Sequence, residues 1–186
     1  MSTLATPQTA ATTIWNIDPA HSVAEFKIRH MMISNVKGRF TAVEGALSLD
    51  ESDLSKSSVQ ASIDTTSINT HEAQRDAHLK SADFLDVEKF PKMSFKSTRI
   101  SDAGNGELKV AGDLTIHGVT RNVTFDVEGP TAATKDPWGN TRRGLSATTK
   151  ISRKDFGVNG AAMMVGDEIS ITIDVELVKP VAAPSH

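Results

Sequence analysis

The last alternating segment of the chain constrains the fold most strongly. Residues 168–178 alternate between polar and apolar side chains, and the apolar set is Ile169, Ile171, Ile173, Val175 and Leu177. Successive side chains of a β-strand point to opposite faces, so a single register places all five on one face. A slip of one residue would invert that face. The segment therefore predicts a strand with one buried face and one solvated face.

The same alternation recurs along the chain. Residues 108–118 repeat it with Gly112 and Gly118 on the inner face, where a glycine leaves room or permits a bend. Asn105-Gly106 suits the positive φ angles of a hairpin turn before this strand. Strands are expected at residues 14–18, 20–31, 36–49, 59–66, 93–100, 107–117, 119–128, 144–153 and 168–178.

One segment carries a helix signal. Thr70 precedes HEAQRDAHLKS, and a threonine can cap the first free amides of a helix while Glu72 favours its positive end. The sequence predicts a short helix over residues 70–81.

Eight or nine strands in 186 residues would leave exposed edges in an open sheet, and closure into a barrel removes them. We therefore expect an all-β fold, an extended eight-stranded antiparallel barrel with a short helical insertion. A barrel of about eight strands can hold one small ligand. Residues 14–179 are expected to form a single domain, and residues 1–13 and 180–186 are expected to be flexible tails.

Composition argues against several functions. Lys and Arg number 20 against 23 Asp and Glu, without a basic run along the sequence, so nucleic acid is not an expected partner. The absence of cysteine excludes disulfides, thiolate metal sites and cysteine nucleophiles. Residues 1–13 lack the charged and apolar parts of a secretory signal, and the chain has no apolar run long enough to span a membrane. We expect a cytoplasmic protein without a membrane span.

The six histidines show no spacing typical of a metal site. His71 and His78 lie seven residues apart, which is about 10 Å along a helix and too far to share one ion. No metal or cofactor is predicted, although His21 and His30 could meet a third ligand at a barrel mouth.

Five fragments of the sequence resemble the YceI-like family over residues 14–177. They are WNIDPAHSVAEFKIRH, VKGRF, RDAHLKSADFLDVEKFPKMSF, VAGDLTIHGVTRNVTF, and RKDFGV followed by VGDEISITIDVEL. The resemblance implies a lipocalin-like barrel with a helical insertion, and a polyisoprenoid or similar long-chain amphiphile, such as an isoprenoid quinone, in an apolar tunnel. Many relatives begin with a secretory signal, and residues 1–13 are not expected to be one.

The candidate ligand-binding residues fall into three groups. The expected tunnel lining is Phe26, Ile28, Phe40, Phe95, Leu114, Ile116 and Phe125. The expected head-group contacts are His30, Arg75, His78 and Arg153, with two alternatives: His30 as a hydrogen-bonded core histidine, and Arg75 with Asp76 as a pin for the insertion. Two methionine pairs, Met31 with Met32 and Met163 with Met164, are expected at a tunnel mouth or lid, or in ordinary packing.

The function expected from these features is that of a non-catalytic carrier. An enzyme acting on a small lipid-like or quinone substrate is the alternative, but the sequence contains no G-x-S-x-G and no paired titratable groups that it would bring together. A homodimer, built on an exposed strand or the helical insertion, is a third alternative. A role in transport, storage or stress protection is left open.

Overall fold

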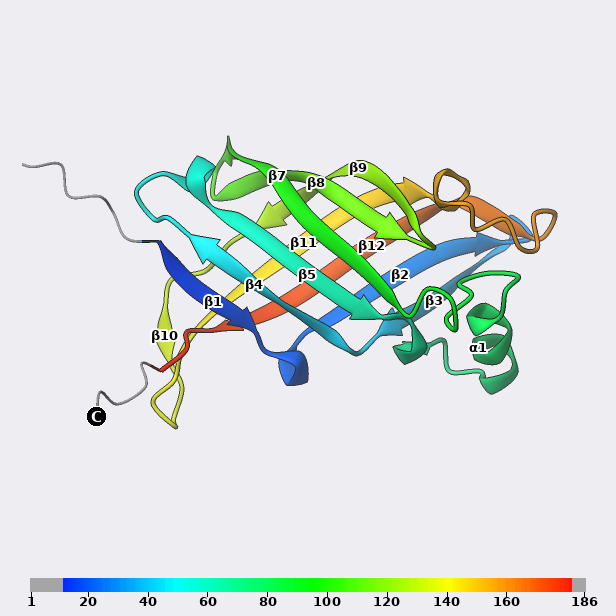
Figure 1. The fold of residues 1–186 in the computed structure, drawn as a ribbon, viewed down its shortest axis with the longest axis horizontal. Coiled ribbons are helices and arrows are strands. Elements are labelled where there is room, and N and C mark those ends of the chain that lie inside the picture. The colour runs from blue at the N-terminus through cyan, green and yellow to red at the C-terminus, as the bar shows by residue number, and fades with distance from the viewer. Residues whose placement is uncertain (1–11, 182–186) are drawn as a thin grey trace, which may run out of the picture.

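The computed structural model describes residues 12–181, which form an elongated β-barrel with one helix at one end (Figure 1). The strands are β1 (Thr13–Ile17), β2 (Val23–His30), β3 (Ser34–Phe40), β4 (Val43–Leu49), β5 (Ser58–Asp64), β6 (Ile68–Asn69), β7 (Lys92–Gly104), β8 (Glu107–Ile116), β9 (Val119–Glu128), β10 (Thr134–Lys135), β11 (Thr141–Ser152) and β12 (Val165–Val178). The helix is α1 (Ala73–Lys80), and short 3₁₀ turns lie at Pro19–His21, Leu54–Lys56, Thr65–Ser67 and Arg153–Phe156.

The last described strand closes the barrel. One edge of β12 pairs with β11 from Glu168 to Val178, and the other edge pairs first with β2 and then with β1. β1 and β2 therefore occupy one row of the barrel in succession, and β4 and β3, which pair with them, occupy the next row. The result is a closed eight-stranded antiparallel barrel with one short helix, which confirms the predicted fold class.

Several predicted boundaries need correction. Residues 36–49 form two strands rather than one, because the chain breaks between β3 and β4 opposite the 3₁₀ turn that separates β1 from β2. β1 begins at Thr13, the last residue of the predicted N-terminal tail. β6 and β10, with two residues each, were not predicted. The remainder of the predicted tails, residues 1–11 and 182–186, lies outside the described residues.

The helix begins later than predicted, and its cap is a different residue. His71 has a left-handed φ of 62°, which a helix cannot continue, so Thr70 lies outside the helix. Glu72 caps it instead, because its carboxylate accepts hydrogen bonds from the amides of Gln74 and Arg75 at 3.1 and 2.6 Å.

The inner faces of the strands divide into packed core and open cavity. On β1, Trp15 packs in a buried cluster with Leu47 and lines no cavity, whereas Ile17, two residues further along the same face, lines one. The space expected at Gly112 is occupied, because a Cβ there would lie 2.6 Å from Cζ of Phe95. The alternation therefore identifies the inner face but does not separate core from cavity.

Candidate functional site: a two-part apolar tunnel

Two adjoining cavities occupy the barrel interior. The larger has a volume of about 320 Å³ and the smaller about 150 Å³. Both walls include Ile63, Met93, Leu114, Phe125 and Ile173, so the cavities meet at these residues. The lining is almost wholly apolar, as is typical of ligand pockets with few orienting polar groups.

The structure places all seven predicted lining residues on a cavity wall. Phe26, Ile28, Phe40, Leu114, Ile116 and Phe125 line the larger cavity, and Phe95 lines the smaller one. Phe95 packs edge-to-face on Phe125 with ring centroids 5.1 Å apart, so this pair stands near the junction of the two cavities. Contact of these residues with a ligand stays a prediction.

All four predicted head-group residues, His30, Arg75, His78 and Arg153, lie in the wall of the larger cavity. Arg75 donates from Nε to Thr70 Oγ1 and from Nη2 to the Thr70 carbonyl, both at 2.8 Å. Asp76 accepts from the amide and hydroxyl of the same threonine at 2.9 and 2.5 Å. These contacts favour the pin alternative for Arg75 and Asp76, although Arg75 Nη1 remains available to a ligand.

The two histidines in this wall differ in their support. His78 Nε2 lies 3.0 Å from Asp83 Oδ2, and its ring packs edge-to-face on Phe84. The carboxylate thus fixes the orientation of the imidazole at the cavity. His30 is half-buried, and its imidazole has no hydrogen bond to another residue within the described part of the chain. The core-histidine alternative therefore has no partner to support it.

The guanidinium of Arg153 has a structural role, and the predicted head-group contact of this residue stays a prediction. The residue is 2% exposed, and its guanidinium donates four hydrogen bonds to carbonyl oxygens of Val158, Gly160, Val165 and Gly166 at 2.7–3.1 Å. Its remaining N–H lies toward Asp167 at 3.8 Å. The guanidinium joins the loop before β12 to the first two residues of that strand, so no donor is left for a ligand.

The two methionines before β12 lie differently. Met164 is half-exposed and lines the larger cavity, as a mouth residue would. Met163 lines neither cavity and is 98% exposed, so the structure gives no support to a ligand contact for it.

Part of the cavity wall was missed at the sequence level. Phe84 and Leu85 line it from the segment after α1, and Phe156 and Val158 line it from the segment after β11. The apolar residues of DFLDVEKF are a usable signal for this part of the wall, although carboxylates lie among them.

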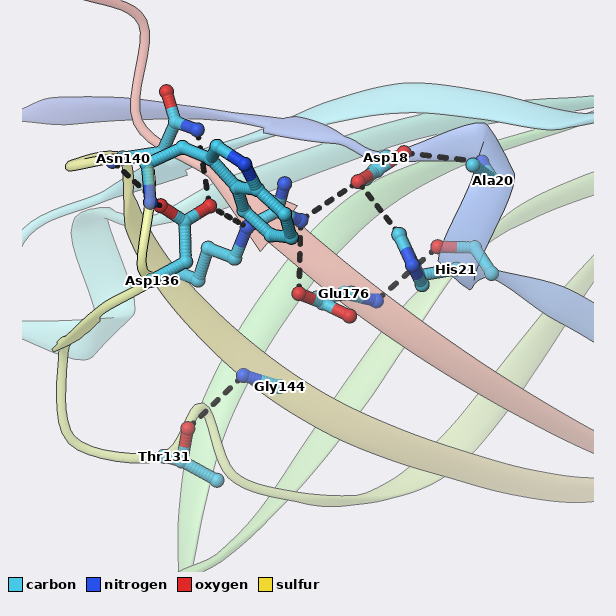
Figure 2. Close-up of polar contacts among 11 residues, drawn as sticks. Asp18, Ala20, His21, Thr131, Asp136, Asn140, Gly144 and Glu176 are labelled. Atoms are coloured by element: carbon cyan, nitrogen blue, oxygen red, sulfur yellow. Dashed lines mark hydrogen bonds and ion pairs between the residues drawn. The ribbon is translucent and has the colours of Figure 1, made fainter.

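A third hollow, open and polar, lies beside β10 and β11 at the barrel end away from α1. Three carboxylates converge there on Arg142: Asp18 at 2.7 Å, Asp136 at 2.7 Å and Glu176 at 2.8 Å, as Figure 2 shows. Arg142 lowers the pKa of Asp18 to about 2, with help from His21, and that of Asp136 to about 2, with help from Asn140. The cluster ties the β10–β11 hairpin to the barrel.

Within residues 12–181, no group of three His, Asp or Glu side chains is arranged to hold a metal ion. In the same range, no helix is long and apolar enough to cross a membrane.

The closed barrel and its apolar interior define a lipocalin-like β-barrel. The YceI-like domain model matches residues 15–177, and the chain belongs to that family.

Relatives and solved structures agree with this assignment. A UPF0312 protein of Vibrio cholerae is 42% identical over 154 residues, which cover 82% of this chain and 81% of that protein. The YCEI protein of Campylobacter jejuni superposes with a TM-score of 0.72 at 30% identity, covering 82% of this chain and 90% of that one. A polyisoprenoid binding domain from Saccharophagus degradans has the same fold, with a TM-score of 0.67 at 14% identity and coverage of 89% and 98%.

Proposed function

We propose that this protein is a non-catalytic carrier that holds a polyisoprenoid or a similar long-chain amphiphile, such as an isoprenoid quinone, in its barrel. The observation that carries the proposal is the pair of adjoining apolar cavities with ionisable side chains in the wall of the larger one only. The likeness in fold to a polyisoprenoid binding domain supports the same ligand class.

The energetics of such a ligand fit the cavity chemistry. Each methylene group transferred from water to an apolar wall contributes about 0.8 kcal/mol, so an extended chain needs few polar contacts. The chain would lie through both cavities past Leu114 and Phe125, which line both. Its polar head would then lie at the α1 end of the larger cavity, near His30, Arg75 and His78.

The first test is native mass spectrometry of gently purified protein, beside mass spectrometry of its organic-solvent extract. We expect a stoichiometric isoprenoid or fatty compound, or uptake of added polyprenol or quinone by an empty protein. A protein that is empty and takes up none of these compounds contradicts the proposal. Chemical conversion of the bound compound would also contradict the non-catalytic role.

Two further expectations stay predictions. Cell fractionation tests the cytoplasmic location, and measurement of the mass at several protein concentrations tests the homodimer.

A further inference from the structure

Two neighbouring turns expose apolar side chains at the α1 end of the barrel. We call Met31, Met32, Ile33, Met163 and Met164 the apolar tip; their exposed fractions are 55, 70, 79, 98 and 52%. The Met31 amide donates to the Met164 carbonyl at 2.7 Å, which holds the two turns together. Figure 1 shows these turns, between β2 and β3 and before β12, at the end of the barrel away from β10.

The backbone of the β2–β3 turn is fixed in a costly conformation. Met31 and Met32 have left-handed φ angles of 48° and 59°, which long side chains adopt rarely. The turn is held by Arg29, whose Nη2 donates to the Met32 carbonyl at 2.9 Å, and by the Ile33 amide, which donates to the His30 carbonyl at 3.1 Å. These bonds keep the apolar side chains in solvent, so packing within the protein does not account for them.

Basic side chains flank the tip on the outer face of the same hairpin. Residues 26–40 contain Lys27, Arg29, Lys37 and Arg39 and no acidic residue. The strand register places Lys27 directly opposite Lys37, an arrangement that destabilises an isolated sheet. The ion pairs formed within the described chain include none of these four residues. Glu25, at the far end of β2, lies directly opposite Arg39, so the uncompensated positive charge beside the apolar end is that of Lys27, Arg29 and Lys37.

The apolar tip is continuous with the tunnel. Met164 belongs to the tip and also lines the larger cavity, and the paired residues His30 and Val165 line it as well. A surface that received the tip would therefore lie against the mouth of the cavity.

We propose that the apolar tip and its basic flank dock this protein on an anionic lipid bilayer. Apolar side chains enter the boundary between head groups and acyl chains. Each lysine or arginine near an anionic surface strengthens binding about fivefold through its attraction to the lipid phosphates. Docking would bring the cavity mouth to the layer in which long-chain amphiphiles dissolve. The purpose of docking, ligand exchange, rests on the proposed function, but docking itself can be measured without a ligand.

The experiment is flotation of the full chain with vesicles of phosphatidylcholine alone and with vesicles that also contain phosphatidylglycerol. We expect binding to the anionic vesicles that weakens as salt is added, and little binding to the neutral vesicles. Absence of binding to the anionic vesicles overturns the proposal. The apolar tip would then be a surface for another protein or for a second copy of the chain.

Two variants test the surface itself. Lys37→Glu reverses one charge opposite Lys27, and we expect it to weaken binding to anionic vesicles roughly tenfold or more while leaving or raising the Tm, because it creates a cross-strand ion pair. The triple variant Met31→Asn, Met32→Asn, Ile33→Ser removes the apolar side chains with residues that tolerate the turn. It should abolish the binding that persists at high salt.

Matched controls lie at the opposite end of the barrel. Lys135→Glu makes the same charge change on β10, and Trp138→Ser removes an exposed apolar side chain there that is 83% exposed. Both should bind vesicles as the wild type does. Equal losses of vesicle binding in the tip and control variants would overturn the proposal, because binding would then depend on overall charge or on exposed apolar side chains in general. Native mass spectrometry, combined with flotation, separates the docking proposal from the carrier proposal. A protein that contains ligand but does not bind vesicles contradicts docking alone. A protein that binds vesicles but is empty and takes up no lipid contradicts the carrier function alone.

Discussion

At the scale of single residues, Arg153 shows how a charged side chain can serve the barrel without meeting a ligand. Its guanidinium is buried and donates to carbonyls of the loop 157–166 the hydrogen bonds that water would otherwise donate. That loop supplies Val158, Ala161 and Met164 to the larger cavity. The shape of the cavity therefore depends on a residue whose polar atoms point into the loop.

We expect Arg153→Met to lower the free energy of unfolding by about 3 kcal/mol, since buried carbonyls lose charged donors. Urea denaturation measures the change. The neighbouring Lys154→Met is the control, because Lys154 is about half exposed and its ion pair with Asp167 is worth less than about 1 kcal/mol. Unchanged stability together with weaker ligand binding in Arg153→Met would restore the head-group role.

The Arg142 cluster predicts the response to acid. Asp18 and Asp136 have pKa values of about 2 in the fold against an ordinary value of 3.8, because both accept hydrogen bonds from Arg142. A lowered folded pKa contributes stability that is present above the unfolded value and is lost as the pH falls. Stability measured by denaturation should therefore decline between about pH 4 and pH 2.

The substitution Arg142→Met should flatten that decline and lower the Tm at neutral pH by several degrees. Arg121→Met is a control, because Arg121 is exposed and donates to the Thr120 carbonyl rather than to a carboxylate. Equal slopes in the wild type and Arg142→Met would show that the acid response arises elsewhere.

At the scale of elements, the contact of β7 with β8 depends on a glycine. Gly112 on β8 lies beneath the ring of Phe95 from β7, and there is no room for a methyl group. The ring in turn packs on Phe125 near the junction of the two cavities. One residue without a side chain thus allows an aromatic pair to stand between the two parts of the tunnel.

We expect Gly112→Ala to destabilise the protein by about 2 kcal/mol, the cost typical of overpacking, and to displace Phe95. Thermal or urea unfolding measures the cost. Gly144→Ala is the control, because a Cβ at Gly144 meets nothing closer than 3.9 Å and should change stability by less than about 1 kcal/mol. A stable Gly112→Ala would mean that Phe95 moves without cost.

Period-two alternation predicts the main strands because each must bury one face and solvate the other. It does not predict the break at Thr41–Ala42, since that break is set by the row of β1 and β2 beside it. The helix start was misplaced because Thr70 and Glu72 are both good caps, and the backbone at His71 decides between them.

At the site, the sequence predicts the inward aromatic and aliphatic residues, but not which of them face empty space. Trp15 packs in the core and lines no cavity, whereas Ile17 lines the smaller cavity, although both occupy the same face of β1. The distance between opposite walls of the barrel decides whether a side chain on this face meets another side chain or empty space. The role of Arg153 was equally hidden, because it depends on how the loop 157–166 folds around it.

At the scale of the whole molecule, the affinity of the tunnel should depend on the length of the ligand. Leu114 lines both cavities, so Leu114→Trp would obstruct the passage between them. We expect affinity for a long polyprenol to fall at least about tenfold, since excluding two methylene groups costs about 1.6 kcal/mol. Affinity for the short farnesol should change little.

Competition binding with the two alcohols measures this ratio. Thr148→Trp adds the same ring on the exposed outer side of β11 and should leave both affinities unchanged. Equal losses for farnesol and polyprenol in Leu114→Trp would mean that the ligand does not extend through both cavities.

The position of β12 has a consequence for how the protein is made. β12 pairs with β11 on one edge and with both β2 and β1 on the other, so the barrel closes only when this final described strand is in place. While the ribosome is still adding residues 165–178, the edges of β2 and β11 have no partner there, and unpaired edges attract other chains. Closure also joins segments far apart in sequence, which slows folding. A nascent chain of this protein should therefore depend on chaperones until its last strand emerges.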